Sequence, residues 1–391
     1  MKFDLLVRGG RVIDPAQGID REMDIGVTAG RIRALVPPVG STLGEDSAER
    51  VLDAAGALVV PGLVDIHTHV YVGVCQLTVL ADEMASRSGV TTMISAGDAG
   101  ANTVEGFRDL IVHRARTRIL AFLHISTVGL TPFPFGESLH LELLDTDAAE
   151  RAINRFPDMI VGLKVRQGGS TITGSNGVEP LARALEVGRR TDRPVMVHIT
   201  ESDVPIGHLL GILRAGDIVT HCFNGSANGL VDGNRLSEAA QEARARGVLF
   251  DVGHGAGSFA FRVAEVAASA GFWPDTISTD LHSLSVTLAK DLPSVMSKLL
   301  SLGMPLIDVI AAVTSRAAHA IHRSDLVGSL RVGQVADIAV LDLVEEPLQL
   351  EDCAGELRTV ERRLVARHTV RAGAVWGAPA HPGVGTSLLF P

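Results

Sequence analysis

The chain has 391 residues, 46% of them hydrophobic and 20% charged, a composition that is ordinary for a soluble globular protein and excludes a disordered or fibrous one. Its 35 basic and 45 acidic residues give a formal net charge of −10 without a dense run of Lys or Arg, so nucleic acid and anionic membranes are not expected partners. No apolar run reaches the ~18 residues of a membrane span, no signal-peptide core is present at the start, and Cys75, Cys222 and Cys353 form no CxxC pair. We therefore expect a protein of the reducing cytoplasm, without disulfides.

Residues 1–58 alternate short strand-like runs with glycine turns, and similar runs return at Gly333–Asp342 and Val370–Trp376. Short strands with this punctuation indicate a β structure. Neither half buries enough apolar surface alone, so we expect residues 1–58 and 326–391 to form one small β-sandwich domain from both termini. The Gly/Pro/Ala-rich tail after residue 377 is expected to be loosely ordered or to lie on a neighbouring molecule.

From residue 59 to 325, short β-branched runs alternate with longer segments of helical apolar spacing. The predicted strands are Leu63–Thr68, Thr91–Ser95, Ile119–Ile125, Ile160–Val165, Val195–Ile199, Ile218–His221, Leu249–Val252 and Thr276–Thr279. The predicted helices include Glu179–Arg190, Leu236–Arg246, Phe261–Ala270 and a closing helix at Pro305–Ile321. Eight strands alternating with helices over roughly 260 residues predict an α/β fold, a (β/α)8 TIM barrel. An open doubly wound sheet is the alternative, but no GxGxxG follows the first strand.

The first predicted barrel strand delivers two histidines to one face. Side chains of a strand alternate between its faces, so His67 and His69 point the same way. Two neutral imidazoles side by side are half of a metal site. A chain with 14 histidines also produces such pairs by chance, so the interpretation depends on what the other strands supply.

Other predicted strands end in further side chains that can bind a metal ion. His198 ends the fifth strand, His221 ends the sixth, and Asp280 follows the eighth. Each has an ordinary interpretation, because a lone histidine at a strand end is more often a hydrogen-bonded core residue and an aspartate often caps a helix. However, the carboxyl ends of barrel strands meet at one rim. Their convergence there with the histidine pair favours a metal centre.

Lys164 interrupts the apolar run Met159–Val165, where burial of an ammonium group is costly. Burial lowers the pKa of a lysine and exposes its neutral amine. Carbon dioxide can convert that amine into a carbamate, whose two oxygens could bridge two cations. A lysine that extends to solvent and a Schiff-base nucleophile are the alternatives. With histidines on both sides in sequence, we predict an N6-carboxylated Lys164 between two divalent metal ions.

This ordered set of motifs resembles the amidohydrolase superfamily, in its binuclear, carboxylated-lysine branch close to dihydroorotases and dihydropyrimidinases. The resemblance rests on Val59–His69, Gly89–Thr92, Lys164, His198, His221, Asp280 and Gly328–Ile338. It implies that His67, His69, Lys164 and Asp280 hold one metal and that Lys164, His198 and His221 hold the other. Zinc is the expected metal, and iron, manganese and nickel also suit these N and O ligands. Asp280 would then be catalytic, taking the proton of a water that bridges the metals.

The chain departs from the dihydroorotase pattern after the histidine pair, where those enzymes typically carry an arginine that binds the substrate carboxylate and this chain has Tyr71. The motifs look more like those of a subgroup often labelled dihydroorotase-like amidohydrolase/deacetylase. This resemblance implies that the substrate is a small acylated acid. We therefore expect hydrolysis of an amide or ester bond in an N-acyl amino acid or O-acyl hydroxy acid. The alternatives are a cyclic amidase of the dihydroorotase, dihydropyrimidinase or hydantoinase kind and, more remotely, a non-catalytic scaffold.

The expected partner is a small-molecule substrate with a carboxylate. Arg166 shares a strand face with Lys164 and either reaches that carboxylate or supports the rim loops. The glycine-rich loop with His254 and Gly255 either contacts an anionic group or is a plain flexible loop. Tyr71 either donates to the scissile carbonyl or packs. The sequence leaves open whether the chain forms a homo-oligomer.

Overall fold

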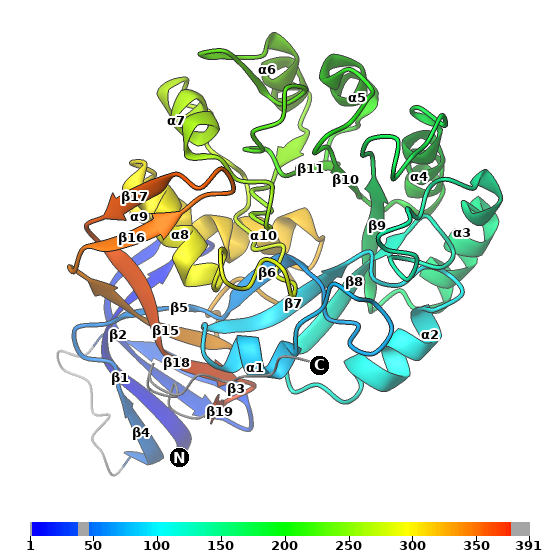
Figure 1. The fold of residues 1–391 in the computed structure, drawn as a ribbon. Helices are drawn as coiled ribbons and strands as arrows, with labels where there is room; N and C mark the ends of the chain where they lie inside the picture. The colour runs from blue at the N-terminus through cyan, green and yellow to red at the C-terminus, as the bar shows by residue number, and fades with distance from the viewer. Residues whose placement is uncertain (1, 38–46, 377–391) are drawn as a thin grey trace, which may run out of the picture.

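The computed structural model describes residues 2–37 and 47–376, and the predicted tail after residue 377 lies outside them. Two parts are visible in Figure 1, a ring of strands surrounded by helices and a sheet that contains strands from both ends of the chain. The fold is therefore the mixed α/β barrel with a terminal β region that the sequence predicts.

The barrel contains seven parallel strands that are hydrogen-bonded in chain order. They are β6 (Leu63–Thr68), β7 (Val90–Ala96), β8 (Arg118–His124), β9 (Ile160–Arg166), β10 (Val195–His198), β11 (Ile218–Thr220) and β14 (Leu249–Phe250). These runs are rich in β-branched and other apolar residues, as expected for strands that are covered on both faces. All seven correspond to predicted strands.

Helices follow the strands and form the outer layer, as Figure 1 shows for α3 to α7. Their bounds are α1 (Ala81–Ser86), α2 (Val104–Phe107), α3 (Thr146–Arg155), α4 (Glu179–Thr191), α5 (Ile206–Ile212), α6 (Glu238–Ala245), α7 (Phe261–Ser269), α8 (Leu292–Ser301), α9 (Leu306–Ala312) and α10 (Ser315–Ala320). The predicted single helix at Pro305–Ile321 is divided into α9 and α10. The carbonyl of Val313 turns away to accept a hydrogen bond from Val64 of β6, which interrupts the helical ladder.

The eighth predicted strand, Thr276–Thr279, is not a regular strand. An isolated parallel bridge joins Thr276 to Asp251, and a second joins Leu281, just beyond the segment, to Thr68. Individual hydrogen bonds close the barrel on both sides, including those from His254 N to Ser278 O and from Asp280 N to His67 O. Buried carboxylates take up other donors of this segment, because Asp65 accepts from both the backbone N and the hydroxyl of Thr279.

Strands from both ends of the chain form one eight-stranded sheet, with the order β19-β18-β15-β5-β1-β2-β3 and β4 beside β1. They are β1 (Phe3–Asp14), β2 (Ile19–Thr28), β3 (Arg31–Val36), β4 (Ala48–Asp53), β5 (Leu58–Pro61), β15 (Ile338–Val344), β18 (Arg363–Arg371) and β19 (Ala374–Trp376). Figure 1 shows β15 of the C-terminal part beside the blue β5 of the N-terminal part, with which it pairs. The termini therefore meet as expected, and the division at residues 58 and 325 remains a prediction.

A single residue, Gly62, separates β5 of the terminal sheet from β6 of the barrel. A Cβ atom at this position would lie 2.3 Å from the hydroxyl oxygen of Thr91, so no side chain fits without displacing β7. The backbone N of Gly62 donates to Asp337 O at 2.8 Å. The strand that carries His67 is thus joined directly to the terminal sheet.

Two small hairpins complete the described chain, β12 (Val231–Asp232) with β13 (Arg235–Leu236) and β16 (Leu348–Glu351) with β17 (Leu357–Val360). Cys75 and Cys222 are buried thiols, and Cys353 is partly buried. Within residues 2–37 and 47–376, no helix has both the length and the apolar character that crossing a membrane requires.

Candidate metal centre

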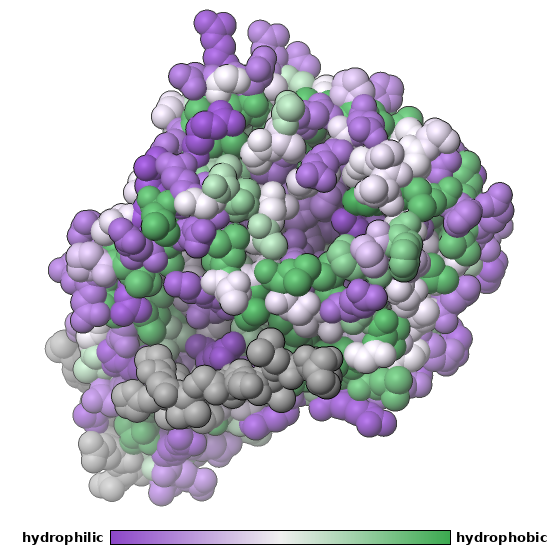
Figure 2. Space-filling model, in the orientation of Figure 1, coloured by the Kyte–Doolittle hydropathy of each residue, from purple (hydrophilic) through white to green (hydrophobic). Residues whose placement is uncertain are grey.

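A cavity of about 200 Å³ opens at the rim where the carboxyl ends of the barrel strands meet. Figure 2 shows this face of the molecule, with a hollow that has hydrophilic residues inside it. The cavity is lined by His67, His69, Leu77, Leu130, Phe133, Lys164, Arg166, His198, His221, Ala256, Gly257, Ser258, Asp280, His282 and Leu284. All six predicted metal ligands are in this set.

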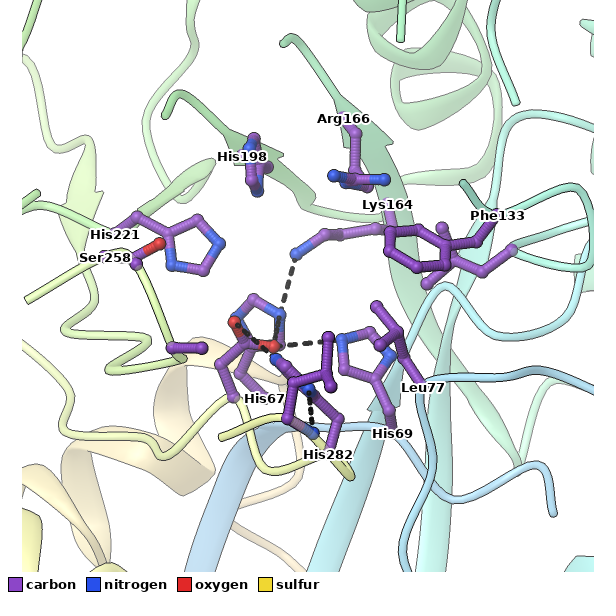
Figure 3. Close-up of a pocket in the computed structure, with 15 residues that line it drawn as sticks. His67, His69, Leu77, Phe133, Lys164, Arg166, His198, His221, Ser258 and His282 are labelled. Carbon is purple, nitrogen blue, oxygen red and sulfur yellow. Dashed lines mark hydrogen bonds and ion pairs between the residues drawn. The ribbon is translucent and has the colours of Figure 1, made fainter. Parts of the chain in front are cut away.

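The predicted ligands converge from β6, β9, β10, β11 and the segment after the barrel closure (Figure 3). The Nε2 atom of His67 lies 3.1 Å from Lys164 Nζ and 3.3 Å from Asp280 Oδ1. The Nε2 atom of His69 lies 3.0 Å from the same carboxylate oxygen. One ligand atom each of His67, His221 and Asp280 lies within 4.8 Å of the other two. This spacing is suitable for a shared cation.

Polar groups behind His67 fix the orientation of its ring. Its Nδ1 lies 2.8 Å from the hydroxyl oxygen of Thr220, and that hydroxyl donates to Asp251 at 2.8 Å. Because the hydroxyl proton is committed to Asp251, Nδ1 of His67 carries the proton and Nε2 is left with a free lone pair. Asp251 is held in turn by hydroxyl donors from Thr276 and Ser278.

The same arrangement recurs behind two more histidines. Nδ1 of His69 lies 2.5 Å from Asp98 Oδ1, and Nδ1 of His221 lies 2.6 Å from the carbonyl of Gly253. In each case Nε2 is the nitrogen left for the cavity. Metal-binding histidines commonly donate their other ring N–H to a carboxylate or a carbonyl in this way. The donor set therefore fits a metal centre.

Burial keeps three of the four imidazoles in the neutral form that binds metals. It lowers the pKa of His67 and His198 well below the ordinary value and that of His221 to about 4. At His69 burial acts in the same direction, but the carboxylates of Asp98 and Asp280 outweigh it and raise the pKa to about 9. The rings of His198 and His221 meet edge to face, with centroids 4.5 Å apart. A charged imidazole here would lack the water that normally stabilises it.

Lys164 reaches into the cavity instead of turning toward solvent, as Figure 3 shows. The residue is 1% exposed, and burial lowers its pKa to about 7. Its Nζ faces His67 on one side and lies 3.5 Å from Met196 Sδ on the other. An amine with this pKa is neutral in a substantial fraction of molecules near neutral pH, the form that reacts with carbon dioxide.

Asp280 and His221 adopt backbone conformations that are unusual for residues other than glycine, with φ of 48° and 68°. Such strain persists where the surrounding structure enforces it, commonly at functional sites. Burial acts to raise the pKa of Asp280, but the surrounding histidines, among them the protonated His69 that donates to this carboxylate, outweigh burial and hold the pKa well below its usual range. The carboxyl group is therefore ionised at neutral pH.

Arg166 lines the cavity and is paired with a carboxylate that the sequence did not reveal. Its Nη1 donates to both oxygens of Glu137 at 3.2 and 3.4 Å, and Glu137 is 1% exposed. Nε2 of the buried His124 lies 3.8 Å from Glu137 Oε1. Glu137 comes from the long loop after β8, where no periodic pattern reveals which residues face the barrel rim.

Three residues predicted to contact the substrate do not line the cavity. The hydroxyl of Tyr71 donates to Thr103 O at 3.1 Å and its ring packs against Phe107, so this residue stabilises the rim from behind. His254 is fully buried, and Gly255 lies beneath Asp280. The next three residues, 256–258, line the cavity instead, and so does His282.

The sequence analysis did not identify the carboxylates that support the histidines, although the positions of two of them in the sequence could have indicated this role. Asp98 follows β7 and Asp251 follows β14, so both occupy the position at a strand end from which His198 and Asp280 were inferred. Their short side chains, however, contact the backs of histidines and do not line the cavity.

Comparison with known proteins identifies close relatives of this chain. Two models described as "Amidohydrolase family" match residues 50–152 and 227–375. A protein named "Deacetylase Atu3266" from Agrobacterium fabrum is 38% identical over 338 residues, which cover 86% of this chain and 83% of that protein. A "Deacetylase" from Enterococcus faecalis is 30% identical over 96% of this chain and all of that protein.

Solved structures give a similar result. A dihydroorotase structure has a TM-score of 0.88 at 33% identity and covers 96% of this chain and 99% of its own. An adenine deaminase structure also has a TM-score of 0.88, at 29% identity, and covers 96% of this chain and all of its own. The similarity extends through both the barrel and the terminal β region.

Proposed function

Because this chain belongs to the amidohydrolase family and is a hydrolase, we propose that it removes the acyl group from a small acylated acid, an N-acyl amino acid or an O-acyl hydroxy acid. The observation that carries the proposal is the convergence of four histidines, Lys164 and Asp280 around one small cavity. The relatives named deacetylases, at 30 and 38% identity over most of the chain, support this reaction over others of the family.

We assign two divalent metal ions, zinc by preference, to this cavity. His67, His69, Lys164 and Asp280 would hold one, and Lys164, His198 and His221 the other, with Lys164 carboxylated on its Nζ. When bound, two such ions supply Lewis-acid activation of water and of the scissile carbonyl. The imidazole Nε2 atoms that face the cavity and the carboxylate of Asp280 are ligands that zinc prefers.

Asp280 is the group best placed to move protons in this reaction. Its carboxylate is ionised and lies between His67 and His69, so it can accept a proton from the attacking water. The same carboxyl group then delivers the proton to the leaving nitrogen or oxygen. His282, whose Nε2 lies 3.9 Å from Asp280 Oδ2, adds a polar group beside that path.

The substrate would bind through its carboxylate to Arg166. One nitrogen of the guanidinium is occupied by Glu137, which holds the group in place and leaves its other donors for a ligand in the cavity. Apolar side chains of Leu77, Phe133 and Leu284 border the mouth, where the non-reacting part of a substrate would lie. A cavity of about 200 Å³ limits the substrate to a small molecule.

The alternative function is the opening of a cyclic amide. The similarity to a dihydroorotase structure at 33% identity supports this alternative. To decide, zinc-loaded protein should be assayed side by side with N-acetyl amino acids of both configurations, O-acetyl hydroxy acids, dihydroorotate, dihydrouracil and hydantoin. Release of acetate supports the proposal. Ring opening without release of acetate would replace the deacylation proposal with a cyclic-amidase function. Inactivity toward both the acylated acids and the cyclic amides would exclude both functions. A Lys164→Met variant, purified in parallel, controls for contaminating hydrolases.

A further inference from the structure

Behind the cavity wall, Lys298 of α8 is completely buried and makes two short hydrogen bonds. Its Nζ lies 2.6 Å from His254 Nε2 and 2.6 Å from the backbone O of Glu351 in β16. The ammonium group also lies 5.5 Å and 5.8 Å from the ring centroids of Phe259 and Phe261. A buried charge is costly unless it is paired, and nothing in the proposed reaction requires one at this place.

The contact with Lys298 restricts His254 to one tautomer. An ammonium group can only donate, so Nε2 of His254 accepts and the ring proton lies on Nδ1. Nδ1 then donates to the carbonyl of Gly255 at 2.8 Å. Stacking against Phe259, at 4.9 Å between centroids and 15° between planes, fixes the ring itself. His254 is neutral at physiological pH, because burial and then the charge of Lys298 lower its pKa to about 3.

Gly255 connects this pair to the reaction site. Its backbone N donates to Thr279 O at 2.9 Å, and its φ is +56°. A Cβ atom here would lie 2.5 Å from Oδ2 of Asp280, so only glycine allows this approach to the carboxylate. The next three residues, 256–258, line the cavity. The orientation of the Gly255 carbonyl therefore affects both the surroundings of Asp280 and the start of the cavity wall.

The other end of the same wall is attached to the hairpin of β16 and β17, which lies beside α8 (Figure 1). The backbone N of Cys353 donates to Phe259 O at 2.9 Å, and the backbone N of Phe261 donates to Asp352 Oδ2 at 2.8 Å. Together with the bond from Lys298 to Glu351, these contacts attach the wall to an element outside the barrel.

We propose that Lys298 is a positioning residue for the hydrolytic reaction and acts through His254 on the cavity wall that begins at Gly255. Lys298 touches neither substrate nor metal ligand in this assignment. It selects the tautomer of His254 that donates to the Gly255 carbonyl. This hydrogen bond fixes Gly255 and, with it, the close packing of Gly255 against Asp280. The inference rests on the proposed function, because it presumes that Asp280 transfers the proton.

The first test is a Lys298→Met variant, which keeps the length of the side chain but removes its donors. In metal-loaded protein we expect kcat to fall about 10- to 100-fold, the scale of a small misplacement of reacting groups, while KM and bound metal change little. Lys2→Met, at an exposed position just before β1, is the matched control and should keep the wild-type kcat.

Two substitutions of His254 separate its two hydrogen bonds. His254→Gln keeps an acceptor for Lys298 but loses the donor to Gly255 O, whereas His254→Asn keeps that donor and leaves Lys298 without its acceptor. If Lys298 acts through Gly255, His254→Gln should lower kcat as much as Lys298→Met does. His254→Asn should keep more activity but should lower the free energy of unfolding. The opposite ranking would overturn the route through Gly255.

A substrate-independent readout completes the design. The ¹⁵N chemical shifts of the His254 ring should show one Nδ1–H tautomer in the wild type and a mixture in Lys298→Met. If this change occurs but the wild type hydrolyses no acylated acid, the proposed function fails while the link between Lys298 and His254 stands. If Lys298→Met keeps the wild-type tautomer, or the wild-type kcat per bound metal, the positioning role is refuted.

Discussion

Asp98 accepts a hydrogen bond from Nδ1 of His69 at 2.5 Å, and this contact turns Nε2 of the same ring toward Asp280, 3.0 Å away. Asp98 is itself fixed, because its other oxygen accepts from the backbone N of Val70 at 2.7 Å and from the hydroxyl of Ser95 at 2.9 Å. A carboxylate that never reaches the cavity thus decides which nitrogen of His69 faces it.

Asp98→Asn should therefore weaken metal binding. The amide has no negative charge to favour an N–H on Nδ1 of His69, and loss of such a partner typically costs about 10- to 100-fold in affinity. Competition with a chelator of known affinity measures the change. Asp109→Asn, which alters an exposed carboxylate paired with Arg108, serves as control. Equal zinc affinity in the Asp98 variant and the wild type would contradict this role.

Asp280→Asn should abolish most hydrolysis while leaving much of the metal in place. An amide cannot take a proton from water, and a general base typically contributes about 10²- to 10⁴-fold to the rate. Acetate release and metal content should be measured on the same samples. Asp232→Asn, an exposed change in the hairpin of β12 and β13, is the control. A variant that stays active would exclude Asp280 as the base.

Arg166→Met should raise KM for acylated acids and spare substrates without a carboxylate. Hydrogen bonds to charged groups contribute about 1.5 to 3 kcal/mol, which corresponds to a roughly 10- to 100-fold increase in KM. Glu137→Gln should act in the same direction but less strongly, because Arg166 stays charged and loses only its anchor. Comparing each acylated acid with its neutral carboxamide separates this effect from general damage, which would affect both substrates equally.

Removal of metal should abolish activity, and its recovery should depend on carbon dioxide. If Lys164 is carboxylated, zinc added back in buffer purged of carbon dioxide restores little activity, and added bicarbonate restores the rest. The mass of the intact protein under native conditions would show the added carboxyl group. Full recovery in purged buffer would rule out the carbamate and leave Lys164 as a free amine.

Protein stability should rise with pH above about 8 because of Lys298. Burial, followed by the nearby Lys290, lowers the pKa of Lys298 from 10.5 to about 8. Between these two pH values the folded protein loses the proton first, so the unfolded chain binds more protons and the free energy of unfolding increases with pH. At 1.36 kcal/mol per pKa unit, the full gain is about 3 kcal/mol. The buried Lys164, whose pKa is lowered to about 7, contributes a rise of its own over this range. Urea unfolding of the wild type and of Lys298→Met at pH 7 to 10.5 therefore measures the part due to Lys298 as the difference between the two proteins.

The sequence was sufficient to predict the barrel and the meeting of the six proposed ligands at one cavity, because both follow from strand periodicity. Apolar runs marked the strands from β6 to β14, and the polar residues that end them, such as His198 and His221, had to meet at one rim. Periodicity could not decide between the two roles left open for Tyr71. Strand β6 ends at Thr68, and beyond that point alternation no longer fixes the direction of a side chain.

Other features depend on contacts between distant segments, which a single sequence does not reveal. The pairing of Arg166 with Glu137 joins a strand end to a loop residue 29 positions away. The irregular closing segment owes its hydrogen bonds to buried carboxylates, among them Asp65. The sequence gives no sign of the role of Lys298, because its acceptor is the backbone carbonyl of Glu351, a group that every residue carries.

The antiparallel pairing of β5 with β15 has a consequence for synthesis of the chain. Val59 lies opposite Val340 in this pair, so the ribosome adds some 280 residues before β5 finds its second neighbour. Since one glycine links β5 to the strand that bears His67, that nascent strand stays attached to a half-paired edge throughout that interval. Chaperone dependence and premature-termination products of this protein should reflect that delay.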